Sequence, residues 1–480
     1  MNRSRRTART CSALLLLVSA THAAPPEVRP YHVSHYDITV QPELAQQLIR
    51  GLVTLDIVAL KDKLTTIDLD ASEMMILACG QARRRFRYVR TNDILHVDLP
   101  HPLKMNQKTQ ITIRYEATPR NGVRFSNDQM YTVFATSHWL PCNERPSDRA
   151  VYTMHVIAPA SLTVVASGEF VSARLDKGET VSTWTTQHPI STFVAGFAMG
   201  RFTTRSDREM AGRSVVGHKP QQPAGGLDAV TYLISPEFRK PPVPQAASDP
   251  AAKAESPAPS SAKPSPDAGS IFSTTRAAAA FFAEKAGEPY PGHTYTEVFT
   301  STDVAQEADQ FTLLSEGYFA NLTDHPDDAW LVAHELAHQW WGISITCSDW
   351  SDFWLNEGMA TYMADAFLEQ QYGKQRYEKE IEHSHQIYRE SLINGQDRPL
   401  SYHEWTRPEQ AGGPLPYHKG AWFLHLLREQ IGDKQFWLGL RQYTRANWQK
   451  SVSSQTFQTF IEQACRCNLQ NTFNKYVYAL

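Results

Sequence analysis

The sequence lacks a long apolar segment and an excess of charge of one sign, and each absence excludes a class of protein. Its longest apolar run, residues 11–20, is far shorter than the roughly 20 residues of a membrane-crossing helix, so we expect no membrane span. Its 47 basic residues nearly balance its 50 acidic residues, giving a net charge of −3. This balance gives no electrostatic reason to expect a nucleic-acid partner, and composition does not predict an oligomeric state.

Cysteine is also scarce, with six residues in a chain of 480. Five of them, at positions 79, 142, 347, 465 and 467, follow the N-terminal segment, and this number is too small for a fold built on disulfides. Cys465 and Cys467 are separated by one residue, which we interpret as too close for an easy mutual bridge. They also lack the further thiolates of a structural zinc site, so we expect packed or exposed thiols.

The first 23 residues have the pattern of an export signal. Arg3, Arg5, Arg6 and Arg9 precede the apolar stretch Leu14–Leu17, and small residues stand at Thr21 and Ala23. A charged start, an apolar middle and a small-residue end occur in this order in signal peptides. We expect residues 1–23 to be removed and the protein to be exported, to a periplasm or to the extracellular space.

Hydrophobic periodicity divides the remaining chain into two parts. Segments such as residues 52–58 and 151–156 alternate apolar and polar residues, which predicts an all-β domain over residues 24–218. Residues 219–480 change to the helical period and are predicted to be mainly α, so the fold class is α+β. Within them, residues 241–270 contain eight Pro, eight Ala and six Ser and no aromatic residue, which predicts a disordered insertion.

The strongest chemical motif is His334-Glu335-Leu336-Ala337-His338, in a segment predicted to be helical. Residues four apart share one face of a helix, so both imidazoles can bind one cation. Glu335 lies beside them, where it can reach a metal-bound water without being a ligand. The motif alone is short enough to arise by chance.

Glu357 supplies the missing third ligand. Eighteen residues separate it from His338, and it lies near the start of the next predicted helix. Two antiparallel helices joined by a short connection bring Glu357 against His334 and His338, which leaves one position of a catalytic zinc ion open. Thr361, four residues after Glu357, is a candidate to hold a metal ligand in position without binding the metal itself.

With these residues the sequence resembles the aminopeptidase N family of gluzincin zinc metallopeptidases. The resemblance includes Trp340-Trp341-Gly342 and Trp354-Leu355-Asn356-Glu357-Gly358, then Tyr417-His418-Lys419-Gly420-Ala421, and also Leu140-Pro141-Cys142 in the β half. It implies one zinc ion and an N-terminal β domain on a thermolysin-like catalytic domain. It also suggests a short form, because the chain leaves no room for the C-terminal helical-repeat domain of many members.

The resemblance also assigns roles to residues that no local pattern identifies. Tyr417 matches the family tyrosine that donates a hydrogen bond to the oxyanion of the tetrahedral intermediate. Family exopeptidases bind the substrate α-amine with a Glu in a Gly-x-Met-Glu-Asn segment before the zinc helix. In register this chain has Gln306-Glu307-Ala308-Asp309-Gln310, with Asp309 in the place of that Glu and without the Gly and Met. A further amine-binding residue has no clear counterpart, Thr132 being the nearest.

The sequence therefore predicts zinc-dependent hydrolysis of peptide bonds, with peptides as substrates. Glu335 acts as general base on the zinc-bound water and Tyr417 stabilises the oxyanion. Release of N-terminal residues depends on Asp309 acting in place of Glu. An endopeptidase or atypical peptidase is the alternative that this departure leaves open, and a non-catalytic peptide-binding scaffold is a further one.

Overall fold

The computed structural model describes residues 29–126, 128–207, 227–235 and 268–479. The predicted signal peptide, and residues 241–267 of the predicted disordered insertion, lie outside them. The last three residues of that insertion are helical, because α2 (Ala268–Ala286) begins there. No helix among the described residues combines the length and apolar character that crossing a membrane requires.

The first half is built from β-strands, as predicted. An eight-stranded sheet has the order β13-β14-β11-β1-β2-β8-β4-β5. Its strands are β13 (Glu169–Asp176), β14 (Glu179–Thr185), β11 (Val151–Pro159), β1 (Tyr31–Glu43), β2 (Leu48–Ala59), β8 (Lys108–Ala117), β4 (Met74–Gln81) and β5 (Arg84–Arg85). Strands β1, β2 and β8 alternate buried and partly exposed residues, because the sheet covers a core on one face.

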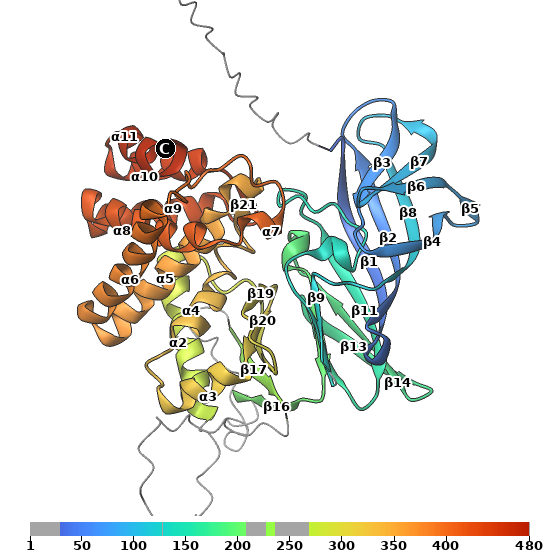
Figure 1. Cartoon of the computed structure of the whole chain (residues 1–480), viewed down its shortest axis with the longest axis horizontal. Coiled ribbons are helices and arrows are strands. Elements are labelled where there is room, and N and C mark those ends of the chain that lie inside the picture. The colour runs from blue at the N-terminus through green and yellow to red at the C-terminus, as the bar shows by residue number, and fades with distance from the viewer. Residues whose placement is uncertain (1–28, 127, 208–226, 236–267, 480) are drawn as a thin grey trace, which may run out of the picture.

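Two smaller sheets complete this half (Figure 1). One has the order β3-β7-β6, formed by β3 (Leu64–Asp70), β7 (Ile94–Leu103) and β6 (Arg87–Thr91). The other has the order β12-β15-β10-β9, formed by β12 (Thr163–Ala166), β15 (Phe197–Gly200), β10 (Gln129–Thr132) and β9 (Val123–Phe125).

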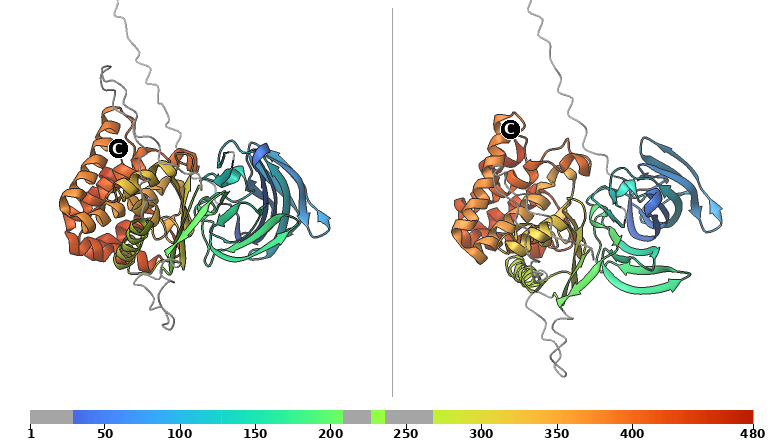
Figure 2. Two further views of the ribbon diagram at one scale, coloured as in Figure 1. Left: turned by 90° about the horizontal axis from the view of Figure 1, so that it is seen from below. Right: turned by 60° about the horizontal axis from the view of Figure 1, so that its bottom comes forward.

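The second half combines a five-stranded sheet with helices, which confirms the α+β class. The sheet has the order β16-β17-β18-β20-β19, formed by β16 (Thr203–Ser206), β17 (Ala229–Ile234), β18 (Thr294–Thr300), β20 (Phe311–Ser315) and β19 (Gln306–Ala308). Figures 1 and 2 show it between the helices and the β half. Strand β16 precedes the predicted boundary at residue 218 but belongs to this sheet, since it pairs with β17.

The helices cover one side of that sheet. The main ones are α2, α3 (Glu316–Asp324), α4 (Trp330–Ala337), α5 (Trp354–Tyr372), α6 (Lys374–Ile393), α8 (Gly420–Ile431), α9 (Asp433–Ala446) and α10 (Ser454–Cys465). Their shared core is rich in aromatic and alanine side chains. The β half has its own core, which is extended by Ile343, Trp350 and Phe353 of the second half. The two halves are therefore joined by buried apolar surface.

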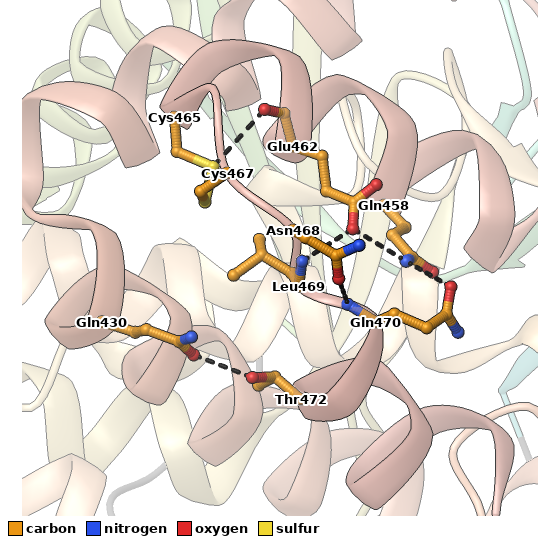
Figure 3. The surroundings of a disulfide bond; sticks show 9 residues. All are labelled: Gln430, Gln458, Glu462, Cys465, Cys467, Asn468, Leu469, Gln470 and Thr472. Carbon is orange, nitrogen blue, oxygen red and sulfur yellow. Dashed lines mark hydrogen bonds between the residues drawn. A yellow bond between two sulfur atoms is a disulfide. The ribbon is translucent and has the colours of Figure 1, made fainter.

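The prediction that Cys465 and Cys467 are free thiols is wrong. The structure joins them in a disulfide at the end of α10, with their Cα atoms 5.2 Å apart (Figure 3). The bridge is possible because Arg466 adopts a left-handed conformation with φ of 54°, which folds the chain back on itself. The backbone N–H of Cys467 donates to the carbonyl of Glu462 and stabilises this turn. Cys79, Cys142 and Cys347 are free and buried.

Candidate active site

The three predicted metal ligands come together between α4 and α5. His334 lies in α4, and His338 occupies the cap position just after the last residue of this helix. The Nε2 atoms of the two imidazoles are 3.1 Å apart. Oε2 of Glu357, in the first turn of α5, lies 3.5 Å from Nε2 of His334 and 3.4 Å from Nε2 of His338. All three side chains are buried.

This donor set fits zinc. Tetrahedral zinc with bonds of about 2.0–2.1 Å has neighbouring ligand atoms about 3.3 Å apart, which matches the three separations here. Nδ1 of His338 lies 3.2 Å from the carbonyl of Trp341, and Nδ1 of His334 lies 3.4 Å from Oγ1 of Thr361. Because each Nδ1 has a partner, Nε2 of each ring is left to bind a metal. Thr361 was predicted to hold a metal ligand in position, and it lies beside His334.

Glu335 lies on the same short helix, next to the ligands. Its Oε2 is 3.4 Å from Oγ1 of Thr312, which comes from β20. Burial raises the pKa of Glu335 well above its usual range, and the negative charges of Glu307 and Glu357 raise it further, against the effect of His338. The environment therefore favours a carboxyl group that holds a proton more tightly than one in water.

Tyr417 reaches the site from a π-helical turn, Leu415–Lys419, that leads into α8. Its ring is stacked near that of His334, with centroids 5.9 Å apart. Burial, followed by the charges of Glu357, Glu307 and Glu335, raises the pKa of Tyr417 well above its usual value. The hydroxyl group therefore keeps its proton and remains a hydrogen-bond donor at neutral pH.

Two glycines explain how this turn approaches α5 so closely. A Cβ atom on Gly358 would lie 2.8 Å from Cα of Gly420, and one on Gly420 would lie 2.7 Å from Cα of Gly358. The backbones therefore touch next to Glu357, which no larger residue would allow. Buried Lys419 fixes the turn from the other direction, since its Nζ donates to Oδ1 of Asp397 at 2.7 Å and to the carbonyl of Arg398 at 2.6 Å.

Asp309 does not join the metal ligands. It follows the end of β19 and is fully buried, with Oδ1 3.6 Å from Nε2 of His188 in the β half. Its backbone N–H donates to the carbonyl of Val194, which also draws it toward the β half. The turn after β19 thus directs this carboxylate to the domain interface, and substrate binding by Asp309 stays a prediction.

Glu307, two positions before Asp309, lies beside Glu335 and His338. One carboxylate oxygen of Glu307 lies within 4.8 Å of ligand atoms of Glu335 and His338. Burial raises the pKa of Glu307 to about 7, and Oε1 has no hydrogen-bond partner among the described residues. Register with the family motif points to Asp309 and gives no signal for Glu307.

Gln339 holds the strand of Glu307 against the zinc-binding helix. This residue follows His338 directly, and its Nε2 donates to the carbonyl of Ala308 at 2.9 Å. Its Oε1 accepts from the backbone N–H of Gln310 at 3.0 Å. The side chain therefore spans the turn after β19, and it links the position of Glu307 to that of His338.

Comparison with known proteins finds matches for both halves of the chain. Residues 32–194 match the Peptidase M1 N-terminal domain, and residues 305–476 match the Peptidase family M1 domain. An M1 zinc metallopeptidase from Deinococcus radiodurans has a similar structure, with a TM-score of 0.72, 25% identity and coverage of 94% of each chain. A mutant of that enzyme bound to a Tyr-Ser-Ala substrate gives a TM-score of 0.71 at 26% identity and the same coverage.

Curated relatives match over shorter segments. A probable aminopeptidase 2 from Sulfurisphaera tokodaii is 32% identical over 139 residues, which are 28% of this chain and 17% of that protein. The human endoplasmic reticulum aminopeptidase 2 is 27% identical over 145 residues, 29% of this chain and 15% of that protein. The match thus spans less than a fifth of the length of either relative. With both domain types in the expected order, the chain belongs to peptidase family M1.

Proposed function

We propose that the protein is a zinc-dependent peptidase that releases N-terminal residues from peptides. The observation that carries this proposal is the carboxylate of Glu307 beside the ligand set His334, His338 and Glu357. A buried carboxylate within 4.8 Å of a ligand atom of His338 can pair with the ammonium group of a peptide N-terminus while the first peptide bond lies at the metal. Glu307 replaces Asp309 in this role.

The other side chains have separate tasks. His334, His338 and Glu357 would hold zinc, which when bound supplies Lewis-acid polarisation of the scissile carbonyl and the attacking water. Glu335 accepts a proton from that water and returns it to the leaving amine. The hydroxyl of Tyr417 donates to the negative charge that develops on the carbonyl oxygen. Thr361 keeps the ring of His334 in its orientation.

Replacing Glu335 with Gln tests the general base. The amide has nearly the same shape but cannot accept the proton, so we expect kcat to fall by about 10²–10⁴-fold. Zinc content, measured by atomic absorption, should stay at one per chain because Glu335 is not a ligand. Unchanged turnover with bound zinc would exclude this residue as the base.

The matched variants E307Q and D309N test the amine site. Each replaces one buried carboxylate by its amide, and each is assayed on an aminoacyl chromogenic substrate and on the N-acetylated form. We expect the wild type and D309N to favour the free amine, and E307Q to lose this preference with a raised KM. The opposite pattern would restore Asp309 as the amine-binding residue.

Equal cleavage of both substrates by the wild type would favour the endopeptidase alternative. Absence of turnover in zinc-loaded wild type on a panel of aminoacyl and internal peptide substrates would favour a non-catalytic scaffold. The retention of ligands, base and hydroxyl donor in one buried group argues against the scaffold, since nothing that hydrolysis needs from the chain is missing.

We also propose that the protein is exported. The support is the signal-like pattern of residues 1–23 and the disulfide between Cys465 and Cys467, since such bonds persist in oxidising compartments. Expression of the full chain followed by N-terminal sequencing tests this proposal. We expect a mature N-terminus near residue 24, and an intact Met1 in the cytoplasmic fraction would contradict it.

A further inference from the structure

Five arginines form the outer edge of the β half, a surface separate from the active site. We call Arg83, Arg84, Arg85, Arg87 and Arg90 the arginine edge. It lies along β5, the end strand of the eight-stranded sheet, and β6, the end strand of the three-stranded sheet. Figure 1 shows these strands at the end of the β half that points away from the helices.

The side chains of the arginine edge face solvent. Every residue from 81 to 92 is exposed apart from Phe86, which is 6% exposed and belongs to the core of the β half. Phe86 therefore anchors the segment while its neighbours project outward. Strands β5 and β6 are extended here, at the ends of their two sheets, while Ala82 and Arg83 form the tight turn that connects β4 to β5.

Positive charge at this edge is incompletely balanced. The sequence has no acidic residue between Glu73 and Asp93, although the chain as a whole carries a net charge of −3. Arg90 pairs with Asp93 at 3.2 Å, and Arg87 lies opposite Asp98 on β7. The side chains of Arg83 and Arg85 make no hydrogen bond or ion pair with any described residue. The arginine edge is thus a local positive patch on an acidic protein.

Exposed apolar side chains accompany these arginines. Met75 and Val89 are each 57% exposed, and Leu77 is 44% exposed. Tyr88 is 39% exposed, and its hydroxyl donates to the carbonyl of Ile76 at 3.2 Å, so it lies against β4 where Met75 and Leu77 project. Large apolar residues on exposed strands are costly unless something covers them.

We propose that the arginine edge docks the protein onto the surface of a bilayer that contains anionic phospholipids. The guanidinium groups bind lipid phosphates, and the side chains of Met75, Leu77, Tyr88 and Val89 enter the headgroup region. A soluble polyanion would use the arginines but would gain nothing from these apolar groups, and this difference favours lipid. The inference does not depend on peptidase activity.

Sedimentation of the full chain with vesicles tests the proposal. Vesicles of equal parts phosphatidylglycerol and phosphatidylcholine should bind the protein, and pure phosphatidylcholine vesicles should not. The variant R83Q/R85Q/R87Q should bind about a hundred-fold more weakly. The control K379Q/R389Q/K434Q removes the same charge from exposed positions on α6 and α9 and should bind like the wild type.

A second variant separates lipid from other anionic partners. Y88S/V89S keeps every arginine, so it should lose vesicle binding while still binding heparin as the wild type does. Equal loss in the two triple variants would show that only net charge matters, and this would overturn the proposal. Vesicle binding that is unchanged in Y88S/V89S would overturn it in favour of a soluble polyanion.

Discussion

Glu297 is a buried carboxyl group outside the active site whose protonation should control stability. It lies on β18 with no exposed surface, and its Oε1 accepts from Oγ1 of Thr275 at 2.6 Å. Burial raises its pKa to about 7, against the lowering effect of that hydrogen bond. The folded state therefore holds a proton that the unfolded state releases near pH 4.5, so stability falls as pH rises through 7.

Replacement of Glu297 with Gln should remove this pH dependence. The amide cannot ionise. Between pH 5 and pH 8.5, the free energy of unfolding should therefore fall by up to about 3 kcal/mol less in E297Q than in the wild type. Urea unfolding followed by fluorescence at both pH values measures the difference. The mutant D433N, at an exposed position, serves as a control and should follow the wild type over this range. Parallel curves for E297Q and the wild type would contradict the assignment.

The residues of the candidate site could be predicted from the sequence only in part. His334 and His338 could be identified because residues four apart share one face of a helix, and Glu335 and Glu357 because of their places in the motif and at the start of the next helix. The choice between Glu307 and Asp309 could not be made from sequence alone. Both are carboxylates two positions apart, and the turn after β19 decides which one reaches His338.

At the scale of elements, α4 and α5 meet through two stripes of residues with a spacing of four. Trp330, His334 and His338 form the stripe on α4, while Glu357, Thr361 and Asp365 form the one on α5. Glu357 contacts both imidazoles, and Thr361 lies beside His334. In the third contact, Nε1 of Trp330 donates to Oδ1 of Asp365 at 2.7 Å.

This third contact should strengthen zinc binding without supplying a ligand. The ring of Trp330 is stacked on that of His334, with centroids 4.9 Å apart, and buried Asp365 fixes the indole. We expect W330A to bind zinc about 10–100-fold more weakly, and W330F to lose less because it keeps an aromatic ring. Competition with a chromogenic chelator measures the affinity, and thermal unfolding in excess zinc controls for folding. Equal zinc affinity in W330A and the wild type would exclude this role.

Sequence patterns located these helices but not their contacts. Apolar periodicity and a final Gly predict a helix over residues 420–431, which are the bounds of α8, and one over residues 352–373, close to the bounds of α5. The pairing of Trp330 with Asp365 joins residues on different helices, and no local pattern announces it. The disulfide was missed for a similar reason, since it depends on the left-handed turn at Arg466.

At the scale of the whole molecule, one arginine ties the two halves together. Arg149 belongs to the β half, is 8% exposed, and donates through Nε and Nη2 to the carbonyl of Pro189 at 3.1 and 2.7 Å. Its Nη1 donates to the carbonyls of Ser344 and Lys450 in the second half, at 3.0 and 3.3 Å. The charge of buried Asp309 lies close enough to oppose the burial effect that lowers the pKa of Arg149 to about 10.

Replacement of Arg149 with Met should lower the stability of the whole molecule. Methionine fills a similar volume but leaves the carbonyls of Pro189 and Ser344 without the donor that Arg149 supplies, and it removes a positive charge that acts on Asp309, at a cost of about 2–5 kcal/mol. Because the halves also share apolar core, the wild type should unfold in one calorimetric transition. In R149M that transition should move to lower temperature and separate into two as the β half uncouples from the helices.

The double mutant R149M/D309N removes both charges, so it should recover part of the lost stability. No recovery would mean that Asp309 is not coupled to Arg149, and the interface position of this carboxylate would then need another cause.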